Sequence, residues 1–467
     1  MRPHTRPSSR RRCVAASVGC GLARLVALLI VAGASIGCGQ EPEVRPTNIL
    51  LISLDTLRED HLGCYGYERP TSTRLDSLAA EGSLFDNCAA TSPRTLPSHA
   101  SMFTGLYPSR HGLQSYPHPN GEHRMLPETC TTLAQVLKMR GFKTAAIVNS
   151  RWVSREFGLD RGFDHFEYVQ ERGDQEEPSD VTDKSLAWLS TVGEKRFFLF
   201  LHWYDLHSDY ASLPEFERDF VGPYGGRADG TTDQLRNVNR GREPPFDDRD
   251  IKHLKDLCDA SICQLDQKIG RVIDHVESLG LLDKTLIIVT SDHGEGFLEH
   301  GHLLHGKWHH QEVIHVPLIV RGPGIPSNRR IKHVVSLVDI MPTVLAALAI
   351  EPPSLTDGVD LCPTLQDRTP NPPHLAVFTS ADHWNSAVTA RDAQHKLYYN
   401  RWTHNTKVYD LIEDPGELRA IEGTPTPAIT ALNDLVSQFI QTEAPDAASG
   451  RMTTQSIEQL KSLGYVW

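Results

Sequence analysis

Side chains that could bind a metal ion and activate a hydroxyl group occur in three separate segments of the sequence. Asp55 follows the apolar run 48–54 (NILLISL), and Asp292 and His293 follow the run LIIVT. Between them, Thr95 opens the string TLPSHASMFTG, in which a proline-initiated turn leads into a predicted helix. Two carboxylates and an imidazole suit a divalent metal ion, and such an ion lowers the pKa of a bound hydroxyl. An Asp-His pair after a strand can also be an ordinary turn, so this chemistry requires the three segments to converge.

These residues need a scaffold that brings the ends of separate strands together. Continuous apolar runs, each short enough for a buried strand, alternate with segments of helical period. The alternation predicts an α/β fold with a mostly parallel central sheet and helices on both faces. Ligands of such sheets collect at the carboxyl ends of the strands, where Asp55, His202 to His207 and Asp292 would lie. The expected strands are residues 48–54, 144–148, 197–202 and 286–290, and the expected helices include 126–140 and 256–279.

Two stretches break this pattern. Residues 208–250 are rich in Gly, Pro, Asp and Arg without a clear period, which predicts a long surface loop or lid near the site. A proline-rich passage follows residue 345, and beyond it residues 376–410 have the pattern of short strands and 428–442 that of a helix. The expected domains are a catalytic domain over residues 47–350 and a small C-terminal α+β subdomain over residues 351–467.

The N-terminal stretch has the features of an export signal. Residues 1–37 contain six arginines and no acidic residue, and the apolar stretch 25–34 is too short to span a bilayer as a mature helix. It ends in SIGC, which resembles the lipobox of bacterial lipoproteins. We therefore expect residues 1–37 to be a signal peptide, Cys38 to be lipidated and 38–46 to be a tether; a simple cleaved signal peptide is the alternative. The predicted location is the bacterial cell envelope, at the periplasmic face of a membrane.

Composition narrows the classes of function. With 467 residues, 39% of them hydrophobic, the chain can bury a large core, and a formal net charge of −12 argues against binding to a nucleic-acid backbone. The 9 cysteines show no spacing typical of a zinc finger. In an oxidising periplasm some of them could pair, for example Cys258 with Cys263, or they could stay as buried free thiols.

Several strings occur in a fixed order between residue 48 and the C-terminus. Each is weak alone, but in this order and spacing the chain resembles the sulfatase family of the alkaline-phosphatase-like superfamily. The strings are LDTLR at 54–58, TLPSHASMFTG at 95–105, SDHGEGFLEHGHLLHGK at 291–307, HVPLIVRGPG at 315–324, SLVDIMPTVL at 336–345 and VYDL at 408–411.

The resemblance implies roles for individual residues. Asp55, Asp292 and His293 would hold a divalent metal ion, for which Ca, Zn and Mn are the candidates, and a second ion could bind nearby. Thr95 would be both a metal ligand and the nucleophile. His207, in the string YDLH, matches an element that contacts the ester or protonates the leaving group; a structural histidine is the alternative.

The region of the nucleophile departs from the family pattern. Sulfatases proper carry Cys or Ser at the position of Thr95, followed by x-Pro-x-Arg, so that the residue can be oxidised to formylglycine. Here His99 stands in place of the Arg. Because Thr cannot become formylglycine, an ester of Thr95 must be broken by attack of water or another acceptor at sulfur or phosphorus. Thr56 also replaces the second Asp of the Asp-Asp pair that calcium sulfatases carry, which makes the metal shell less anionic.

Histidines are concentrated between residues 293 and 315. The stretch from Asp292 to His305 resembles part of the phosphoethanolamine transferases that act on lipid A, in which the matching histidine belongs to the phosphate-binding or second-metal region. We therefore expect His305 in the site, with Lys307 contacting the ester oxygens. Solvated loop positions are expected for His300, His302, His309 and His310, and lesser site candidates are His202, Asp205, Asn149 and Arg58.

The combined prediction is an exported, metal-dependent hydrolase of sulfuric or phosphoric esters with a covalent intermediate on Thr95. Its substrate would be a small molecule, a glycan or a lipid ester, and it would reach the membrane through its lipid anchor. One alternative is a phosphoryl- or phosphoethanolamine-type transferase, although the transmembrane helices that precede the domain in those enzymes are not expected here. The other is a metal-binding protein without catalysis, which need not keep a nucleophile.

Overall fold

The structure is a computed structural model that describes residues 45–113, 122–169, 180–381, 386–441 and 449–451, with the single residues 453 and 458. The predicted signal peptide and Cys38 lie outside the described residues, as does most of the predicted tether. Within the described residues, none of the helices combines the length and the apolar character needed to cross a membrane.

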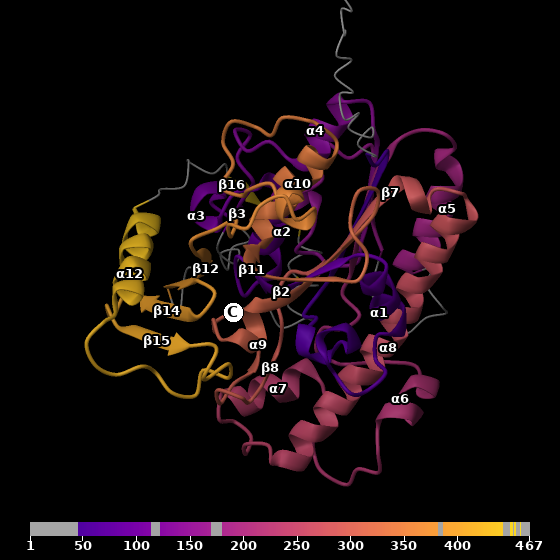
Figure 1. Cartoon of the computed structure of the whole chain (residues 1–467). Coiled ribbons are helices and arrows are strands. Elements are labelled where there is room, and N and C mark those ends of the chain that lie inside the picture. Colours follow the sequence, from indigo (N-terminus) through magenta and orange to yellow (C-terminus); the bar gives the residue numbers. More distant parts are fainter. Residues whose placement is uncertain are drawn as a thin grey trace, which may run out of the picture. The chain divides into compact units, whose positions relative to one another are not determined.

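A sheet forms the centre of the fold (Figure 1). It has eight strands in the order β11-β2-β10-β7-β1-β6-β4-β5. Neighbouring strands are parallel except on the two sides of β10, which runs antiparallel to both β2 and β7. This confirms the predicted, mostly parallel sheet. The strands are β1 (Asn48–Leu54), β2 (Ser83–Ala89), β4 (Lys143–Val148), β5 (His165–Tyr168), β6 (Phe197–Trp203), β7 (Thr285–Ser291), β10 (His315–Arg321) and β11 (Arg329–Ser336).

Strand β1 shows why the sheet is covered on both faces. All of its residues are buried, with Ile49 and Leu51 in one hydrophobic cluster and Leu50 and Ile52 in another. Because successive side chains of a strand point to opposite faces, a continuous apolar run needs helices on each side. The first face is covered by α2 (Thr95–Thr104), α4 (Leu133–Met139) and α10 (Ile340–Ala347), and the second by α1 (Thr73–Ala80), α5 (Val181–Val192) and α8 (Asp248–Ser278) (Figure 1).

Helices α4 and α8 begin at other residues than the periodicity of their apolar side chains predicted. Helix α4 starts later, because Thr132 caps it: its hydroxyl accepts the N–H of Gln135, and the Gln135 side chain accepts the N–H of Thr132. Helix α8 starts earlier, with an equivalent capping box at Asp247. The two starts are therefore set by side-chain caps rather than by the first apolar residue of the period.

The segment 208–250 is not the irregular loop that its composition predicted. It contains α6 (Pro214–Phe220) and α7 (Thr232–Asn239). The Thr231 hydroxyl accepts an N–H of the first turn of α7, which favours a helix start at that point. Apart from Leu235 and Val238, α7 buries little apolar surface, so its helical period was too sparse to detect.

The C-terminal region forms a second, antiparallel sheet with a helix packed on it, as predicted. Val388 of the sheet and Leu432 of the helix share one hydrophobic cluster. Strand β12 is tied to the residues after β2, because the N–H of Ser380 donates to the carbonyl of Thr91. The elements are β12 (Val377–Ala381), β13 (Ala387–Arg391), β14 (His395–Asn400), β15 (Thr406–Asp410) and α12 (Pro427–Ile440).

Two cysteines of helix α8 are free thiols, and several short elements connect the larger ones. The cysteines at 258 and 263 both lie on α8 and are free, so the pairing considered for them does not occur. Burial raises the pKa of Cys258 well above its ordinary value, which keeps this thiol protonated and unreactive. The short elements are β3 (Glu122–Arg124), β8 (Gly296–Phe297), β9 (Leu303–Leu304), β16 (Ser449–Arg451), α3 (Pro108–His111), α9 (Gln311–Ile314) and α11 (Cys362–Leu365).

Candidate active site

Asp55 and Asp292 meet because their strands are parallel neighbours. Strand β1 pairs with β7 so that Leu54 lies opposite Ser291, and the next residue after each is the carboxylate. The Ser291 hydroxyl donates to the Leu54 carbonyl at 2.6 Å, which ties the two strand ends together. Both carboxylates are fully buried. The structure thus brings together the two acidic positions that the strand ends predicted.

Thr95 is the first residue of α2 and lies beside the same strand ends. Its Oγ1 is 3.3 Å from Nε2 of His293. Nδ1 of His293 lies 3.0 Å from the Gly294 carbonyl, so this nitrogen carries the ring proton and Nε2 presents a lone pair. The lone pair faces Oδ2 of Asp292 at 3.4 Å and Oδ1 of Asp55 at 3.8 Å. Thr95, His293 and the two carboxylates therefore point into one small space.

The carboxylate oxygens in this space fit a divalent metal ion. Within the described part of the chain, no well-aligned hydrogen-bond donor reaches either oxygen of Asp55 or Oδ2 of Asp292. A buried polar atom without a partner costs about 1–3 kcal/mol, and more when it is ionised. Burial raises the pKa of Asp55 to about 7, while His293 opposes the rise. Ligand atoms of Asp55, Asp292 and His293 lie within 4.8 Å of one another, an oxygen and nitrogen donor set that suits such an ion.

Thr56 contributes its backbone to this centre rather than a carboxylate. Its φ of 61° is a left-handed conformation that a β-branched residue rarely adopts. In this conformation its N–H points to Oδ1 of Asp292 at 3.4 Å, and the N–H of His293 donates to the same oxygen at 3.0 Å. Asp292 is thus held through Oδ1, and Oδ2 faces the position that a metal ion would take.

His305 and His207 form a second wall of the site. The ring centre of His305 lies 4.2 Å from that of His293 and 5.0 Å from that of His207. Burial lowers the pKa of His305 to about 4 and that of His207 well below its usual range, so both rings are neutral at pH 7. In this state they can exchange hydrogen bonds with an ester but carry no charge.

Glu295, which was not among the predicted site residues, supports this wall. Its Oε1 lies 3.2 Å from Nδ1 of His305, and the Tyr210 hydroxyl donates to its Oε2 at 3.4 Å. Burial raises the pKa of Glu295 to about 8. Tyr210 belongs to the segment 208–250, so this segment reaches the site through Glu295. The available signal was the string DHGE, in which an acidic residue follows the two predicted metal ligands.

Lys307 and Arg58 lack the geometry expected of residues that contact a substrate. The Lys307 side chain is exposed, so its predicted contact with the ester oxygens stays a prediction without geometric support. Arg58 is buried, but its guanidinium binds Asp60 at 2.6 Å, Glu299 at 2.8 Å and the Glu295 carbonyl at 2.9 Å. Arg58 therefore fixes the loop after β7 rather than facing a substrate.

Asn149 and Asp205 support the turn that carries His207. Nδ2 of Asn149 donates to Asp205 at 3.1 Å, and its Oδ1 accepts the N–H of Tyr204 at 2.7 Å. Lys268 binds the same Asp205 carboxylate. The Tyr204 ring stacks on the His207 ring with centres 4.2 Å apart. These residues therefore set the orientation of His207.

The histidines that were expected to be solvated are packed, so that prediction was wrong. His309 is buried, His300 stacks on His310 and His302 stacks on Trp308, with ring centres 3.6 Å apart in both stacks. The ring of His310 also lies edge-on to that of Tyr409 in β15. The loop after β9 packs on the C-terminal sheet, a contact between distant segments that a local sequence pattern does not reveal.

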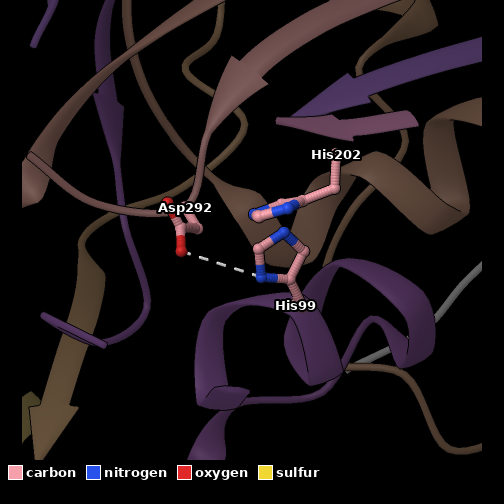
Figure 2. Close-up of side chains that lie close together, drawn as sticks. All are labelled: His99, His202 and Asp292. Atoms are coloured by element: carbon pink, nitrogen blue, oxygen red, sulfur yellow. Dashed lines mark ion pairs between the residues drawn. The ribbon is translucent and has the colours of Figure 1, made fainter. Parts of the chain in front are cut away.

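Two more histidines, which we call the inner histidine pair, border the carboxylates: His99 of α2 and His202 of β6 (Figure 2). Nδ1 of His99 lies 3.7 Å from Oδ2 of Asp292, and Nε2 of His202 lies 3.4 Å from Oδ2 of Asp55. Burial lowers the pKa of His99 to about 3 and that of His202 to about 4. His99 had been noted only as the replacement for an arginine. The signal for His202 was a single imidazole in an otherwise apolar strand.

Comparison with known proteins gives one consistent picture. Residues 47–350 match the family model described as Sulfatase, and residues 298–443 match the one described as N-sulphoglucosamine sulphohydrolase, C-terminal. The N-acetylglucosamine-6-O-sulfatase of Bacteroides thetaiotaomicron is 23% identical over 85% of this chain and 87% of its own length. Arylsulfatase K of Rattus norvegicus is 26% identical over 76% of this chain and 71% of its own length.

Solved structures share the fold at low sequence identity. The structure of BT4656 in complex with its substrate D-glucosamine-2-N,6-O-disulfate has a TM-score of 0.69 at 21% identity, covering 85% of this chain and 98% of that chain. The phosphonate monoester hydrolase of Agrobacterium radiobacter has a TM-score of 0.68 at 21% identity, covering 85% of this chain and 95% of that chain. Proteins that differ in ester type therefore share this architecture.

Proposed function

This chain belongs to the sulfatase family, and we propose that it is a metal-dependent hydrolase of sulfuric or phosphoric esters with Thr95 as its nucleophile. One observation carries the proposal. Oγ1 of Thr95 lies 3.3 Å from Nε2 of His293, next to three buried carboxylate oxygens of Asp55 and Asp292 that make no well-aligned hydrogen bond within the described residues. A hydroxyl in this place would share a cation with those three side chains.

The first step would transfer the sulfuryl or phosphoryl group to Thr95. A divalent cation bound by Asp55, Asp292 and His293 would lower the pKa of the Thr95 hydroxyl and offset charge on the ester oxygens. Oγ1, having lost its proton to solvent, would bond to sulfur or phosphorus while the bond to the alcohol oxygen breaks. The electron pair would leave with that oxygen, which takes up a proton and departs as the alcohol. His207 would hydrogen-bond the departing oxygen. Because α2 begins at Thr95, the positive end of the helix dipole also favours the anionic group.

The second step would release Thr95 by hydrolysis. His305 would accept a proton from water in the state in which Glu295 is ionised, because Nδ1–H then donates to Oε1 of Glu295 and Nε2 keeps its lone pair. The water oxygen would bond to sulfur or phosphorus, the bond to Oγ1 would break, and its electron pair would return to Oγ1, which regains a proton. This route replaces the elimination that a formylglycine hydrate permits.

The comparisons support two classes of substrate. One relative named N-acetylglucosamine-6-O-sulfatase and one structure in complex with D-glucosamine-2-N,6-O-disulfate support sulfated sugars. The fold shared with a phosphonate monoester hydrolase supports phosphate and phosphonate esters. We place the phosphorus esters first, because a Thr ester broken by attack of water suits phosphoryl chemistry.

We also propose that the enzyme is exported and held at the periplasmic face of a membrane by a lipidated Cys38. The arginine-rich start of the sequence and the string SIGC support this location. The mass of the N-terminal peptide from a membrane fraction tests it: an unmodified cysteine, or cleavage at another residue, would contradict it.

The variant Thr95→Ala tests the nucleophile, with Thr95→Ser as the matched control that keeps a hydroxyl. Both are assayed beside the wild type on aryl sulfate, phosphate mono- and diesters and phosphonate esters with Ca, Mg, Mn or Zn. We expect Thr95→Ala to lower kcat/KM at least about a thousandfold on the best substrate, and Thr95→Ser to retain turnover. Mass spectrometry after an acid quench should find the transferred group on Thr95 of the wild type.

Two results would contradict the proposal. Unchanged activity in Thr95→Ala would exclude Thr95 as the nucleophile. No turnover by the wild type on any ester, with metal bound, would favour a binding protein that keeps the fold of the family.

A further inference from the structure

Both ring nitrogens of His202 are buried, and neither makes a hydrogen bond of good geometry with the described residues. The residue lies near the end of β6, whose other residues are all apolar. Alternation along the strand places His202 on the same face as Phe198 and Phe200, which belong to the cluster that α2 covers. An unpartnered buried polar group costs about 1–3 kcal/mol, so a histidine at this position needs a functional reason.

Nε2 of His202 faces one oxygen of a proposed metal ligand. It lies 3.4 Å from Oδ2 of Asp55, whereas Oδ1 of the same carboxylate faces Nε2 of His293 at 3.8 Å. The two oxygens of Asp55 therefore turn toward different imidazoles. If Oδ1 binds a metal ion, Oδ2 needs a donor, because carboxylates that bind metals are themselves hydrogen-bonded by an outer layer of residues.

His99 occupies the neighbouring position but already has partners of its own. Its Nδ1 donates to the Thr95 carbonyl at 2.8 Å, and its Nε2 lies 3.0 Å from the Ser53 hydroxyl. Figure 2 shows its ring next to that of His202. The two ring centres are 4.8 Å apart and the planes meet at 72°. His99 therefore packs against the His202 ring without competing for Asp55.

We propose that His202 is a positioning residue of the metal centre: its Nε2–H holds Oδ2 of Asp55, so that Oδ1 is directed at the metal ion. The inference rests on the proposed metal site and deepens it, because it names a residue on which metal affinity depends. Among the described residues, Asp55, Asp292 and His293 form one compact ligand group, and His202 belongs to another with His99 and Asp292, so direct ligation by His202 is the competing role.

Three variants of the full chain test this role. His202→Leu removes the donor but stays apolar and buried, whereas His202→Gln keeps an amide N–H near the position of Nε2. His310→Ala is the matched control, because it removes a histidine from a different cluster. After removal of metal, Co²⁺ is added, its dissociation constant is measured by competition with a chelator, and its absorption spectrum reports the ligand set.

We expect His202→Leu to weaken Co²⁺ binding about 10–100-fold, the usual effect of losing an outer-layer partner, with one ion per chain and an unchanged spectrum. His202→Gln should recover most of the affinity, and His310→Ala should match the wild type. A purely structural role would not produce this recovery, because Gln does not restore the packing of an imidazole.

Three outcomes separate the possibilities. Equal affinity in His202→Leu and the wild type would overturn the inference and leave the proposed function intact. An altered spectrum in His202→Leu would overturn it in favour of direct ligation. No Co²⁺ binding by the wild type would defeat the proposed metal site itself. If His202→Leu does not fold, the pair His202→Gln and His202→Asn serves instead, because the shorter Asn amide cannot reach Oδ2; equal affinities would again overturn the inference.

Discussion

The inner histidine pair and a second histidine group near the C-terminal sheet have similar ligand spacing but opposite hydrogen bonding. Around the inner pair, both nitrogens of His202, both oxygens of Asp55 and Oδ2 of Asp292 are buried, and none of them makes a well-aligned hydrogen bond within the described residues. These atoms lie at the carboxyl ends of parallel strands, where the fold collects ligands. Their unmet hydrogen-bonding capacity indicates that something outside the protein chain completes them.

The second group, which we call the junction cluster, consists of His300, His310 and Glu312. Its ligand atoms also lie within 4.8 Å of one another. Here, however, Nδ1 of His300 pairs with Glu312 at 2.8 Å and Nε2 of His300 faces the Glu417 carbonyl at 3.3 Å. The buried Lys396 nearby lowers the pKa of His310, after burial itself, and would repel a cation.

Short distances between ligand atoms do not by themselves identify a metal centre. Three groups among the described residues satisfy the distance requirement, but only the two that share Asp292 combine full burial with unpaired carboxylate oxygens. In the junction cluster, both nitrogens of His300 have partners, whereas Nδ1 of His310 makes no hydrogen bond with the described residues. We therefore assign chemistry to the two groups that share Asp292 and, to the junction cluster, the connection of the loop after β9 with the C-terminal sheet.

Asp292→Asn should have the largest effect, because Asp292 belongs both to the ligand group of Asp55 and to that of the inner histidine pair. Loss of its charge removes several kcal/mol of stabilisation, so we expect kcat/KM to fall about a thousandfold and bound metal to fall with it. Steady-state kinetics and elemental analysis measure both. The control Asp283→Asn removes an exposed partner of Arg321 and should change neither. Full metal content in Asp292→Asn would show that the buried carboxylates beside the inner histidine pair do not bind the metal ion.

The parts of the site that the sequence predicted are those fixed by strand ends. Asp55 and Asp292 each follow a continuous apolar run, and parallel neighbouring strands end at the same edge of a sheet. Their meeting therefore required only the correct identification of two strands. Thr95 was placed by the family resemblance, because nothing local in its segment shows which strands it packs against.

His202 could not be placed in the same way, because its orientation depends on strand register. In the pairing of β6 with β1 it lies opposite Ser53, and this register turns its side chain toward α2. A shift of one residue would turn it to the other face. Lys307 follows the β8–β9 hairpin, whose two-residue strands show no period in the sequence. The side-chain positions that the sequence did not predict are thus those that depend on pairing between distant segments.

Lys396→Met tests the region of the junction cluster and should lower folding stability without changing metal binding. Nζ of Lys396 lies 2.5 Å from Oε1 of Glu417, and both side chains are almost fully buried. Breaking a buried ion pair leaves an uncompensated charge, so we expect the free energy of unfolding in urea to fall by about 3–5 kcal/mol. The double variant with Glu417→Gln should recover part of this loss. Loss of bound metal from folded Lys396→Met would show that the two regions are not separate.

Glu312→Gln should have the smallest effect. It tests the contribution of His300 to folding stability, which should change with pH in the opposite direction to the contribution of the inner histidine pair. The hydrogen bond from Glu312 raises the pKa of His300, whereas burial lowers the pKa of His99 and His202. A raised histidine pKa stabilises the fold below the unfolded value of about 6.5, and this contribution is lost as the pH rises through the folded value. Lowered pKa values make the fold less stable as the pH falls below about 6.5.

The wild type should therefore exceed Glu312→Gln in stability at pH 6 by no more than about 1 kcal/mol, because the pair is partly exposed, and the difference should shrink toward pH 8. Thermal unfolding of both proteins across this range measures the difference directly, since histidines common to both contribute equally and cancel. Glu312→Gln should also leave metal content unchanged. A difference that grows with pH would mean that His300 is neutral beside Glu312, and loss of metal would mean that the junction cluster is itself a metal centre.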